Sequence, residues 1–224
     1  MNKINESSIK IPVPGAVLNG DLTIPGGAQA IILFAHGSGS GRKSPRNRYV
    51  AGVLQKSGFA TLLLDLLTPE EEEEDMLTGG YRFNINLLSR RLMIAANFIK
   101  KNAKTKKMNI GYFGASTGAA AALVAAAEDP DIVYAITSRG GRPDMAEDAL
   151  FKVKAPTLLI VGGEDYEVIE INKYALKRLK SEKKLMIVPG ATHLFEEPGA
   201  LEEVSRLAAD WFAEHIKNHG FKQD

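Results

Sequence analysis

Residues 108–127 read MNIGYFGASTGAAAALVAAA, and this stretch decides the fold. A short apolar run, Ile110–Phe113, ends at the pentapeptide GASTG, and an alanine-rich segment of high helix propensity follows at once. The predicted order is therefore strand, tight turn and helix, with Ser116 in the turn. A G-x-S-x-G pattern in that setting is typical of a turn that presents a nucleophilic serine.

The spacing of this pentapeptide has a physical reason. Gly114 and Gly118 have no Cβ atom, so the strand and the helix can pass close beside Ser116. Ser116 would then stand at the N-terminus of the helix, where free N–H groups and the helix dipole favour a developing oxyanion. The alternative is a glycine-flanked serine that only caps the helix. The nucleophile interpretation requires a histidine and an acid later in the chain.

Composition narrows the possible classes of protein. The 224 residues suit a single domain, 1–224, and a hydrophobic content of 45% indicates a globular chain. The formal net charge of +1 gives no strong positive potential that would attract nucleic acid or an anionic membrane. The chain has no cysteine, which excludes disulfides, thiolate metal sites and a cysteine nucleophile.

The sequence contains no signal peptide pattern at its start and no apolar run near the ~20 residues of a membrane helix. We therefore expect a cytoplasmic protein without a membrane or nucleic-acid partner. Nothing in the residues calls for a cofactor or a metal. A monomer and a homodimer are both open.

Apolar runs and amphipathic segments alternate from Ala30 onward. This alternation predicts an α/β fold with a mostly parallel central sheet of about eight strands and helices on both faces. Expected strands are Ile9–Pro12, Ala16–Ile24, Ala30–Ala35, Ala60–Leu64, Ile110–Phe113, Ile132–Thr137, Thr157–Val161 and Lys184–Val188. Expected helices are Arg48–Ser57, Leu87–Lys101, the segment after Ser116, Ile169–Leu179 and Leu201–Ile216.

Candidate catalytic residues follow the predicted strands. Ligands of such sheets bind at the carboxyl ends of the strands, so loops at those ends should share one rim. These loops contain His36, Asp65, Ser116, Asp144, Asp165 and His193.

A serine hydroxyl needs a base, and four histidines are available. His193 follows the last strand and is our predicted base. His36 opens a Gly/Ser loop and is expected to fix that loop by hydrogen bonds. For His215 and His219, in or beyond the last helix, we expect surface positions.

The third residue of the predicted triad orients the imidazole. Asp165 gives the chain order Ser–Asp–His and follows the strand before the one that bears His193, so we favour it over Asp144. Glu164 is adjacent, but neighbouring side chains diverge and only one of the two can face His193.

An oxyanion needs two N–H donors. We expect the backbone of Thr117 to supply one and the Gly/Ser loop, at Ser38, to supply the other. The alternative interpretation of the Gly/Ser loop is a phosphate-binding loop. The loop lacks the G-K-[ST] ending and the G-x-G-x-x-G spacing of nucleotide-binding sites, so nucleotide binding is not favoured.

The chain resembles the dienelactone-hydrolase-like branch of the α/β-hydrolase superfamily. The matching segments include LFAHGSGSGR (33–42), GYFGASTGAAAA (111–122), TSRGGRPD (137–144), LLIVGGED (158–165) and GATHLF (190–195). The resemblance implies an α/β-hydrolase fold and a triad of Ser116, Asp165 and His193. Dienelactone hydrolases proper use a cysteine nucleophile, so ester hydrolysis by serine is the activity expected here. The segment between residues 132 and 157 is too short for a lid domain.

Two groups of charged residues have open roles. The rim arginines could bind an acidic substrate or brace loops by pairing with Asp65 or Asp144, and bracing is favoured; they are Arg42, Arg46, Arg48, Arg139 and Arg142. The acidic run Glu70–Asp75 is expected to be a solvated loop or helix start, because its carboxylates would not converge on a metal.

The sequence thus predicts a serine hydrolase, a carboxylesterase acting on small esters through an acyl-enzyme, without cofactor. One alternative is other acyl-transfer chemistry on the same triad, as in a thioesterase, amidase or acyltransferase. The other is a binding or regulatory protein of low turnover, because a fold does not guarantee activity.

Overall fold

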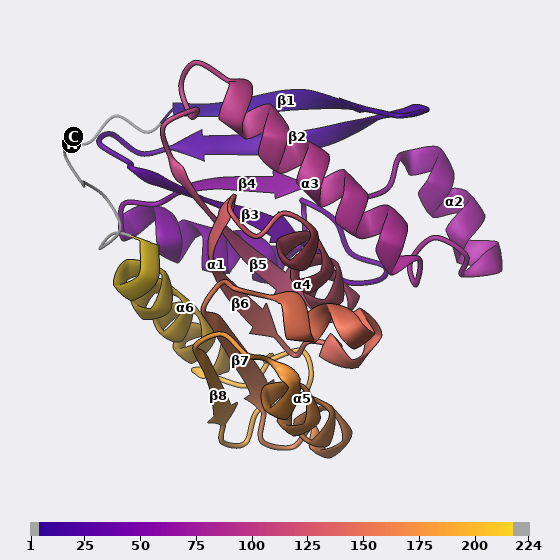
Figure 1. Ribbon diagram of the computed structural model, residues 1–224, viewed down its shortest axis with the longest axis vertical. Coiled ribbons are helices and arrows are strands. Elements are labelled where there is room, and N and C mark those ends of the chain that lie inside the picture. The colour runs from indigo at the N-terminus through magenta and orange to yellow at the C-terminus, as the bar shows by residue number, and fades with distance from the viewer. Residues whose placement is uncertain (1–4, 217–224) are drawn as a thin grey trace.

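A single eight-stranded sheet organises the molecule (Figure 1). The computed structural model describes residues 5–216. The strand order is β1-β2-β4-β3-β5-β6-β7-β8. Strands β1 and β2 pair antiparallel with each other, β2 pairs antiparallel with β4, and every later pairing is parallel. The predicted fold class, a mostly parallel α/β sheet of the α/β-hydrolase type, is confirmed.

The elements alternate along the chain as predicted from Ala30 onward. The strands are β1 Asn5–Val13, β2 Ala16–Ile24, β3 Ala30–Ala35, β4 Ala60–Leu64, β5 Asn109–Ala115, β6 Val133–Arg139, β7 Thr157–Gly162 and β8 Lys183–Val188. The helices are α1 Pro45–Lys56, α2 Pro69–Thr78, α3 Ile85–Lys101, α4 Thr117–Glu128, the 3-10 helix η1 Pro143–Lys152, α5 Tyr166–Arg178 and α6 Ala200–Ile216.

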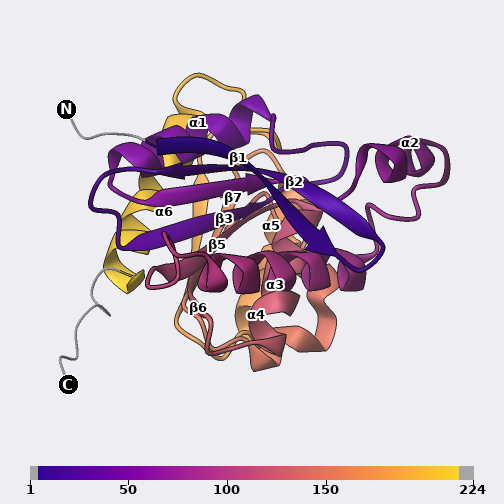
Figure 2. The same cartoon turned by 90° about the horizontal axis from the view of Figure 1, so that it is seen from above.

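Helices cover both faces of the sheet (Figures 1 and 2). Helices α1 and α6 pack on one face, and α3, α4 and α5 lie on the other. All six residues of β3 are buried, as expected of a central strand that is covered on both sides. Between β6 and β7 the chain forms only η1, so no lid domain is inserted there. Within residues 5–216, no helix combines the length and the apolar character needed to cross a bilayer.

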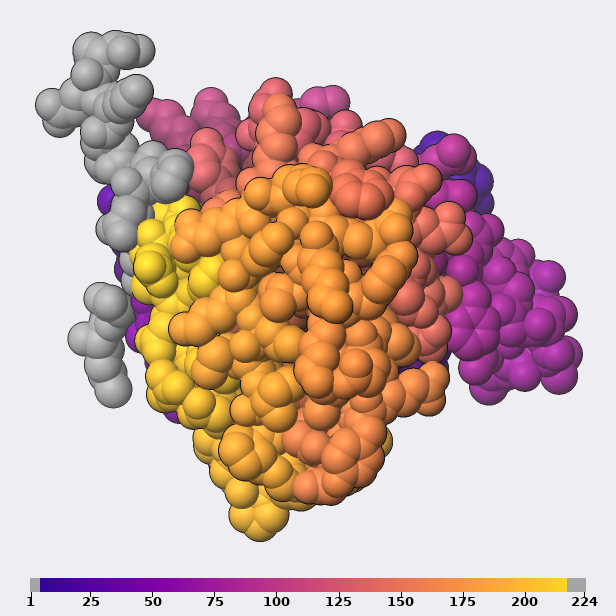
Figure 3. Space-filling model, turned by 60° about the horizontal axis from the view of Figure 1, so that its bottom comes forward, coloured from indigo at the N-terminus to yellow at the C-terminus, as the bar shows by residue number. Residues whose placement is uncertain are grey.

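The acidic run forms helix α2, which stands out from the body of the molecule (Figure 3). Thr68 and Glu71 build a reciprocal capping box at its start, and Gly79 ends it in the left-handed conformation. Its carboxylates diverge, as predicted: Glu71 pairs with Arg91 and Asp75 with Arg82. Among the described residues, no group of three acidic or histidine side chains could hold a metal ion.

The close packing of β5, α4 and β3 depends on Gly118. A Cβ atom at Gly118 would lie 2.2 Å from the carbonyl oxygen of Ala35 and 2.4 Å from that of His36. Both contacts are with backbone, so the neighbours cannot move aside cheaply. Replacing Gly118 with alanine is therefore expected to lower the free energy of unfolding by about 3 kcal/mol or more.

The matched control is Gly52→Ala. Gly52 lies inside α1, and a Cβ atom there meets nothing within 4 Å. That change should raise the free energy of unfolding by about 0.5–1 kcal/mol, because alanine is the better helix former. Urea titration of both variants measures the difference. Equal effects in the two variants would contradict the packing argument.

Candidate active site

Ser116 occupies a strained turn between β5 and α4. Its backbone has φ 50° and ψ −122°, a left-handed conformation that costs a residue with a side chain about 1–3 kcal/mol. The surrounding backbone holds the turn in place: the Ser116 N–H donates to the Arg139 carbonyl at 3.2 Å, and the Arg142 N–H donates to the Ser116 carbonyl at 3.1 Å. This is the geometry that a G-x-S-x-G turn requires for a presented serine.

Two glycines let neighbouring loops close around Ser116. A Cβ atom on Gly37 would lie 3.0 Å from the Ser116 Cβ, so the Gly/Ser loop passes directly against this residue. Gly140, at φ +50°, lies below the imidazole of His193, and a Cβ atom there would lie 3.4 Å from its Cε1. The carbonyl of Arg139 accepts the hydrogen bond from the Ser116 N–H, and Gly140 is the next residue in the chain. The same loop therefore supports both Ser116 and His193.

His193 and Asp165 form a hydrogen-bonded pair. The His193 Nδ1 lies 2.6 Å from Asp165 Oδ2. The His193 side chain is 40% exposed and that of Asp165 is 15% exposed, so the imidazole is open to a substrate and the carboxylate behind it is shielded. Asp165 occupies the N-cap position of α5 without capping it, which leaves its carboxylate free for His193. Such a pair holds the imidazole with Nε2 available as a base.

The two rival acids face elsewhere. Glu164 accepts a hydrogen bond from the Tyr166 hydroxyl at 2.5 Å. Asp144 forms an ion pair with Arg142 at 2.7 Å. The structure therefore places only Asp165, of the three acids considered, against His193.

The two residues predicted to supply the oxyanion donors, Ser38 and Thr117, contact each other through their side chains. The Ser38 and Thr117 hydroxyls are 3.1 Å apart and join the Gly/Ser loop to the start of α4. Thr117 is the first residue of α4, so its N–H has no acceptor within the helix. An oxygen bound next to Ser116 would also meet the positive end of the α4 dipole.

His36 fixes the Gly/Ser loop, as expected. Its Nε2 accepts a hydrogen bond from the Leu66 N–H at 2.9 Å, and its Nδ1 donates to the Gly37 carbonyl at 2.9 Å. Burial lowers the pKa of His36 from its ordinary value of 6.5, against smaller opposing effects of Gly37 and Asp65. His36 is therefore a neutral structural residue.

The prediction for the last-helix histidines was wrong for His215. This residue is buried, and its ring centroid lies 4.0 Å from that of Trp211, because position 215 falls on the core face of α6. His219 lies outside the described residues.

The lowered pKa of His36 makes stability depend on pH. Below pH 6.5 the unfolded chain takes up a proton at this position that the folded protein resists. The free energy of unfolding should therefore fall by up to about 1.4 kcal/mol per pH unit between that value and the lower folded pKa. Unfolding of wild type and His36→Gln from pH 7.5 to 5.5 measures the effect. His36→Gln should be less stable at pH 7.5 and should lose less on acidification; parallel curves would contradict the assignment.

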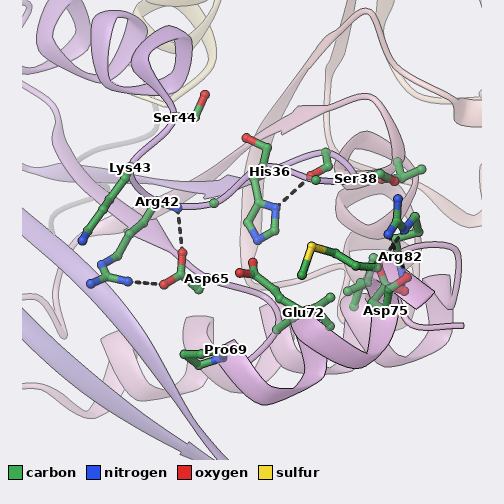
Figure 4. Close-up of a pocket in the computed structure, with 18 of the residues that line it drawn as sticks. His36, Ser38, Arg42, Lys43, Ser44, Asp65, Pro69, Glu72, Asp75 and Arg82 are labelled. Carbon is green, nitrogen blue, oxygen red and sulfur yellow. Dashed lines mark hydrogen bonds and ion pairs between the residues drawn. The ribbon is translucent and has the colours of Figure 1, made fainter. Parts of the chain in front are cut away.

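A cavity of about 730 Å³ opens beside the Gly/Ser loop (Figure 4). Its walls are the loop of residues 37–46, Thr117 and helix α2. Glu72 and Asp65 face the cavity, and burial followed by the charges of Asp65 and Asp75 raises the pKa of Glu72. Because Ser38 and Thr117 line it, the cavity adjoins the predicted oxyanion position and could accept part of a substrate.

Sequence reasoning missed the role of α2 as a wall of this cavity. A readable signal exists, because Thr68 and Glu71 have the spacing of a capping box and Pro69 suits the first helical turn. The acidic character of the segment favoured a solvated loop or helix start. In the structure the segment is the helix α2, and some of its residues line the cavity.

Four of the five rim arginines are ion-paired or exposed, and the fifth is buried. Arg42 pairs with Asp65, and Arg142 pairs with Asp144, as the bracing interpretation predicted. Arg46 pairs with Glu196 at 2.7 Å, and Arg48 is exposed. Arg139 differs from these four, because it is buried and its Nε and Nη1 atoms have no hydrogen-bond partner among the described residues.

Comparison with known proteins agrees with the α/β-hydrolase fold described above. A crystal structure of a dienelactone hydrolase from Anabaena variabilis is 57% identical, covers 95% of this chain and 99% of its own, and superposes with a TM-score of 0.93. The esterase Est1E from Butyrivibrio proteoclasticus is 20% identical, covers 94% of this chain and 99% of its own, and has a TM-score of 0.78, which shows the fold alone.

Two curated relatives are longer than this chain. Proteins of two Mycobacterium tuberculosis strains, each named putative phosphoribosyl transferase, are 54% identical over 209 residues. The match covers 93% of this chain and 46% of the relatives, so the chain spans about half their length. Residues 19–217 match the model of the dienelactone hydrolase family. The chain belongs to the dienelactone hydrolase family, a family of hydrolases.

Proposed function

We propose that this protein is a serine hydrolase that cleaves small carboxylic esters through an acyl-enzyme. The observation that carries the proposal is Ser116 in its strained turn, with the Asp165–His193 pair supported by the same loop. The family supplies the hydrolase class, and the absence of cysteine from the chain leaves serine as the nucleophile at this turn.

The proposed reaction follows from the roles of three side chains. Asp165 accepts the Nδ1 proton of His193 in a hydrogen bond and leaves Nε2 unprotonated. His193 removes the hydroxyl proton of Ser116 as the oxygen attacks the ester carbonyl. The oxyanion that forms accepts hydrogen bonds from the Thr117 and Ser38 N–H groups. His193 then protonates the departing alcohol, and water attacks the acyl-enzyme by the reverse sequence.

One relative supports an ester substrate. A Bradyrhizobium protein named probable 2-oxo-3-(5-oxofuran-2-ylidene)propanoate lactonase is 27% identical over 173 residues, or 67% of this chain and 69% of its own. A lactone is a cyclic ester, so the named activity belongs to the reaction class proposed here. The name of the longer relatives gives no argument for phosphoribosyl transfer, because the match covers only 46% of their length.

Matched substrates test the reaction class. We expect a 4-nitrophenyl ester, the corresponding thioester and the corresponding anilide of one acid to be hydrolysed in the order ester, thioester, anilide. A stoichiometric burst of 4-nitrophenol should precede the steady state if an acyl-enzyme accumulates. A preference for the thioester or anilide, or transfer of the acyl group to an added alcohol in place of water, would favour the alternative acyl-transfer chemistries. No turnover on any of them would favour a binding protein.

A further inference from the structure

The proposed base, His193, lies in a tight turn that follows strand β8. The Phe195 N–H donates to the Thr192 carbonyl at 3.2 Å, so residues 192–195 form a four-residue turn with His193 and Leu194 at its centre. The two central residues face outward, since the His193 side chain and Leu194 are each 40% exposed. Phe195 is 1% exposed, so the chain returns to the core at that residue. The direction of the imidazole therefore depends on how the two ends of this turn are held.

Phe195 ends the turn in a backbone conformation that a residue with a large side chain rarely adopts. Its φ of 57° lies in the left-handed region, which is a true outlier for a bulky residue. Within residues 5–216, the other non-glycine residues with positive φ are Ser116 and Glu147. A strained conformation persists where the surrounding structure enforces it, and such strain concentrates at functional sites. The surroundings of Phe195 must therefore hold it in this conformation.

The buried ring of Phe195 is the feature that holds it. The ring belongs to the apolar cluster on the α1 and α6 side of the sheet, together with Val188, Ala191 and Ala200. Val188 and Ala191 precede the turn, and Ala200 begins helix α6 after it. Burial of a phenylalanine ring stabilises a fold strongly enough to offset one strained residue. The cluster thus fixes the chain on both sides of His193.

The start of the turn is held by the strand end that leads to Asp165. The Glu164 N–H donates to the Ala191 carbonyl at 3.0 Å. A Cβ atom on Gly162, which ends β7, would lie 2.6 Å from the Thr192 carbonyl oxygen, so the two loops are in direct backbone contact. The first residue of the turn is thereby placed next to Asp165. The remaining freedom of the imidazole lies at the other end of the turn.

We propose that Phe195 is a positioning residue, whose buried ring and left-handed backbone aim the imidazole of His193 at Asp165. The inference rests on the proposed roles of His193 and Asp165 in ester hydrolysis. Phe195 is buried, so it acts through His193 and not by touching the substrate. The contact of 2.6 Å between His193 Nδ1 and Asp165 Oδ2 requires one direction of the ring. Misplacement of a reacting group by about 1 Å can lower a rate by about 10²-fold, so a residue behind the base can control kcat.

Phe195→Leu and Phe195→Ala test the proposal by kinetics on a neutral 4-nitrophenyl ester. Both changes reduce the buried side chain and leave Ser116, His193 and Asp165 in the chain. We expect kcat to fall about tenfold in Phe195→Leu and about 100-fold in Phe195→Ala, because the base is misdirected in proportion to the lost anchor. KM should stay within about threefold of wild type, because the substrate contacts are unchanged.

Phe212→Leu is the matched control. Phe212 is fully buried in the same apolar cluster, but it lies in α6 in ordinary helical backbone. A Cβ atom on Gly111 would lie 3.0 Å from the Phe212 Cε1, so Phe212 packs near the start of β5, at the opposite end of that strand from Ser116. Phe212→Leu should lower the Tm, as Phe195→Leu does, and should leave kcat within about twofold of wild type.

The tautomer of His193 gives a readout that needs no turnover. Long-range ¹H–¹⁵N correlation spectra, recorded through the ring carbon protons in alkaline buffer, show which nitrogen carries the proton, and His193→Ala assigns the signal. In wild type and Phe212→Leu, Asp165 should hold the proton on Nδ1. In Phe195→Ala the population should shift toward the tautomer protonated on Nε2, which prevails in a free histidine side chain. A purely structural role for Phe195 would not move this equilibrium.

An unchanged His193 tautomer in both Phe195 variants would overturn the inference, whatever their Tm, and so would an unchanged kcat in both. Phe195 would then be an ordinary core residue. If Phe195→Ala does not fold, Phe195→Leu supplies both readouts. If wild type hydrolyses no ester, the proposed function fails, and the tautomer comparison alone decides whether Phe195 positions His193.

Discussion

Replacing Ser116 with alanine is expected to lower kcat for ester hydrolysis by about 10⁴- to 10⁶-fold. The change removes the attacking oxygen, and the remaining donors at Thr117 and Ser38 can only stabilise a slow attack by water. Ester hydrolysis under saturating substrate measures kcat, and the Tm shows that the variant is folded. The turn itself should survive, because its hydrogen bonds to Arg139 and Arg142 use only the backbone of residue 116.

The control for this change is Ser38→Ala. Ser38 is predicted to act through its N–H, and the hydrogen bond of its hydroxyl within residues 5–216 is to the Thr117 hydroxyl. Loss of that side chain should reduce kcat by about tenfold or less, since the backbone donor remains. A Ser116→Ala variant that retained activity within tenfold of wild type would rule out Ser116 as the nucleophile.

Asp165→Asn is expected to lower kcat by about 10⁴-fold. An amide can donate a hydrogen bond to Nδ1 of His193, which would stabilise the tautomer in which Nε2 carries the proton and cannot act as a base. The Asp165 carboxylate prevents this, because it can only accept from Nδ1 across the 2.6 Å contact. Steady-state kinetics with one ester gives the comparison.

Asp144→Asn is the matched control for that variant. Asp144 is the rival acid from the neighbouring strand end, and it pairs with Arg142 rather than with His193. Its replacement should change kcat by about threefold or less, with a small loss of stability from the part-exposed ion pair. A larger loss in Asp144→Asn than in Asp165→Asn would reverse the assignment of the acid.

The parts of the site that the sequence predicted are those in which local pattern and chain order decide the outcome. The segment around Ser116 contains a strand, a glycine-framed turn and a helix in consecutive residues, so its structure needs little from the rest of the chain. Asp165 could be preferred over Asp144 because parallel sheets fix which strand ends are neighbours. The fold followed from the same alternation of strands and helices.

What escaped prediction depends on contacts between distant segments. Five rim arginines look alike in sequence, yet Arg139 is the one of the five that is buried without a carboxylate partner in the described residues, because it ends the inner strand β6. The burial of His215 follows from the face of α6 that meets the core, and its tilted ring contact with Trp211, one turn earlier on the same helix, marks that face. Helix α2 needed Arg91 of α3 to hold its capping residue Glu71, a partner 20 residues away.

The most direct test of the central claim is labelling with a fluorophosphonate probe, which reacts covalently with an activated serine. Wild type, Ser116→Ala and His193→Ala are treated in parallel, and the labelled peptide is identified by mass spectrometry. The proposed mechanism predicts stoichiometric labelling of wild type at Ser116 and none in either variant. A folded wild type that remains unlabelled, or one that is labelled at another residue, would contradict the assignment of Ser116 and His193 as nucleophile and base.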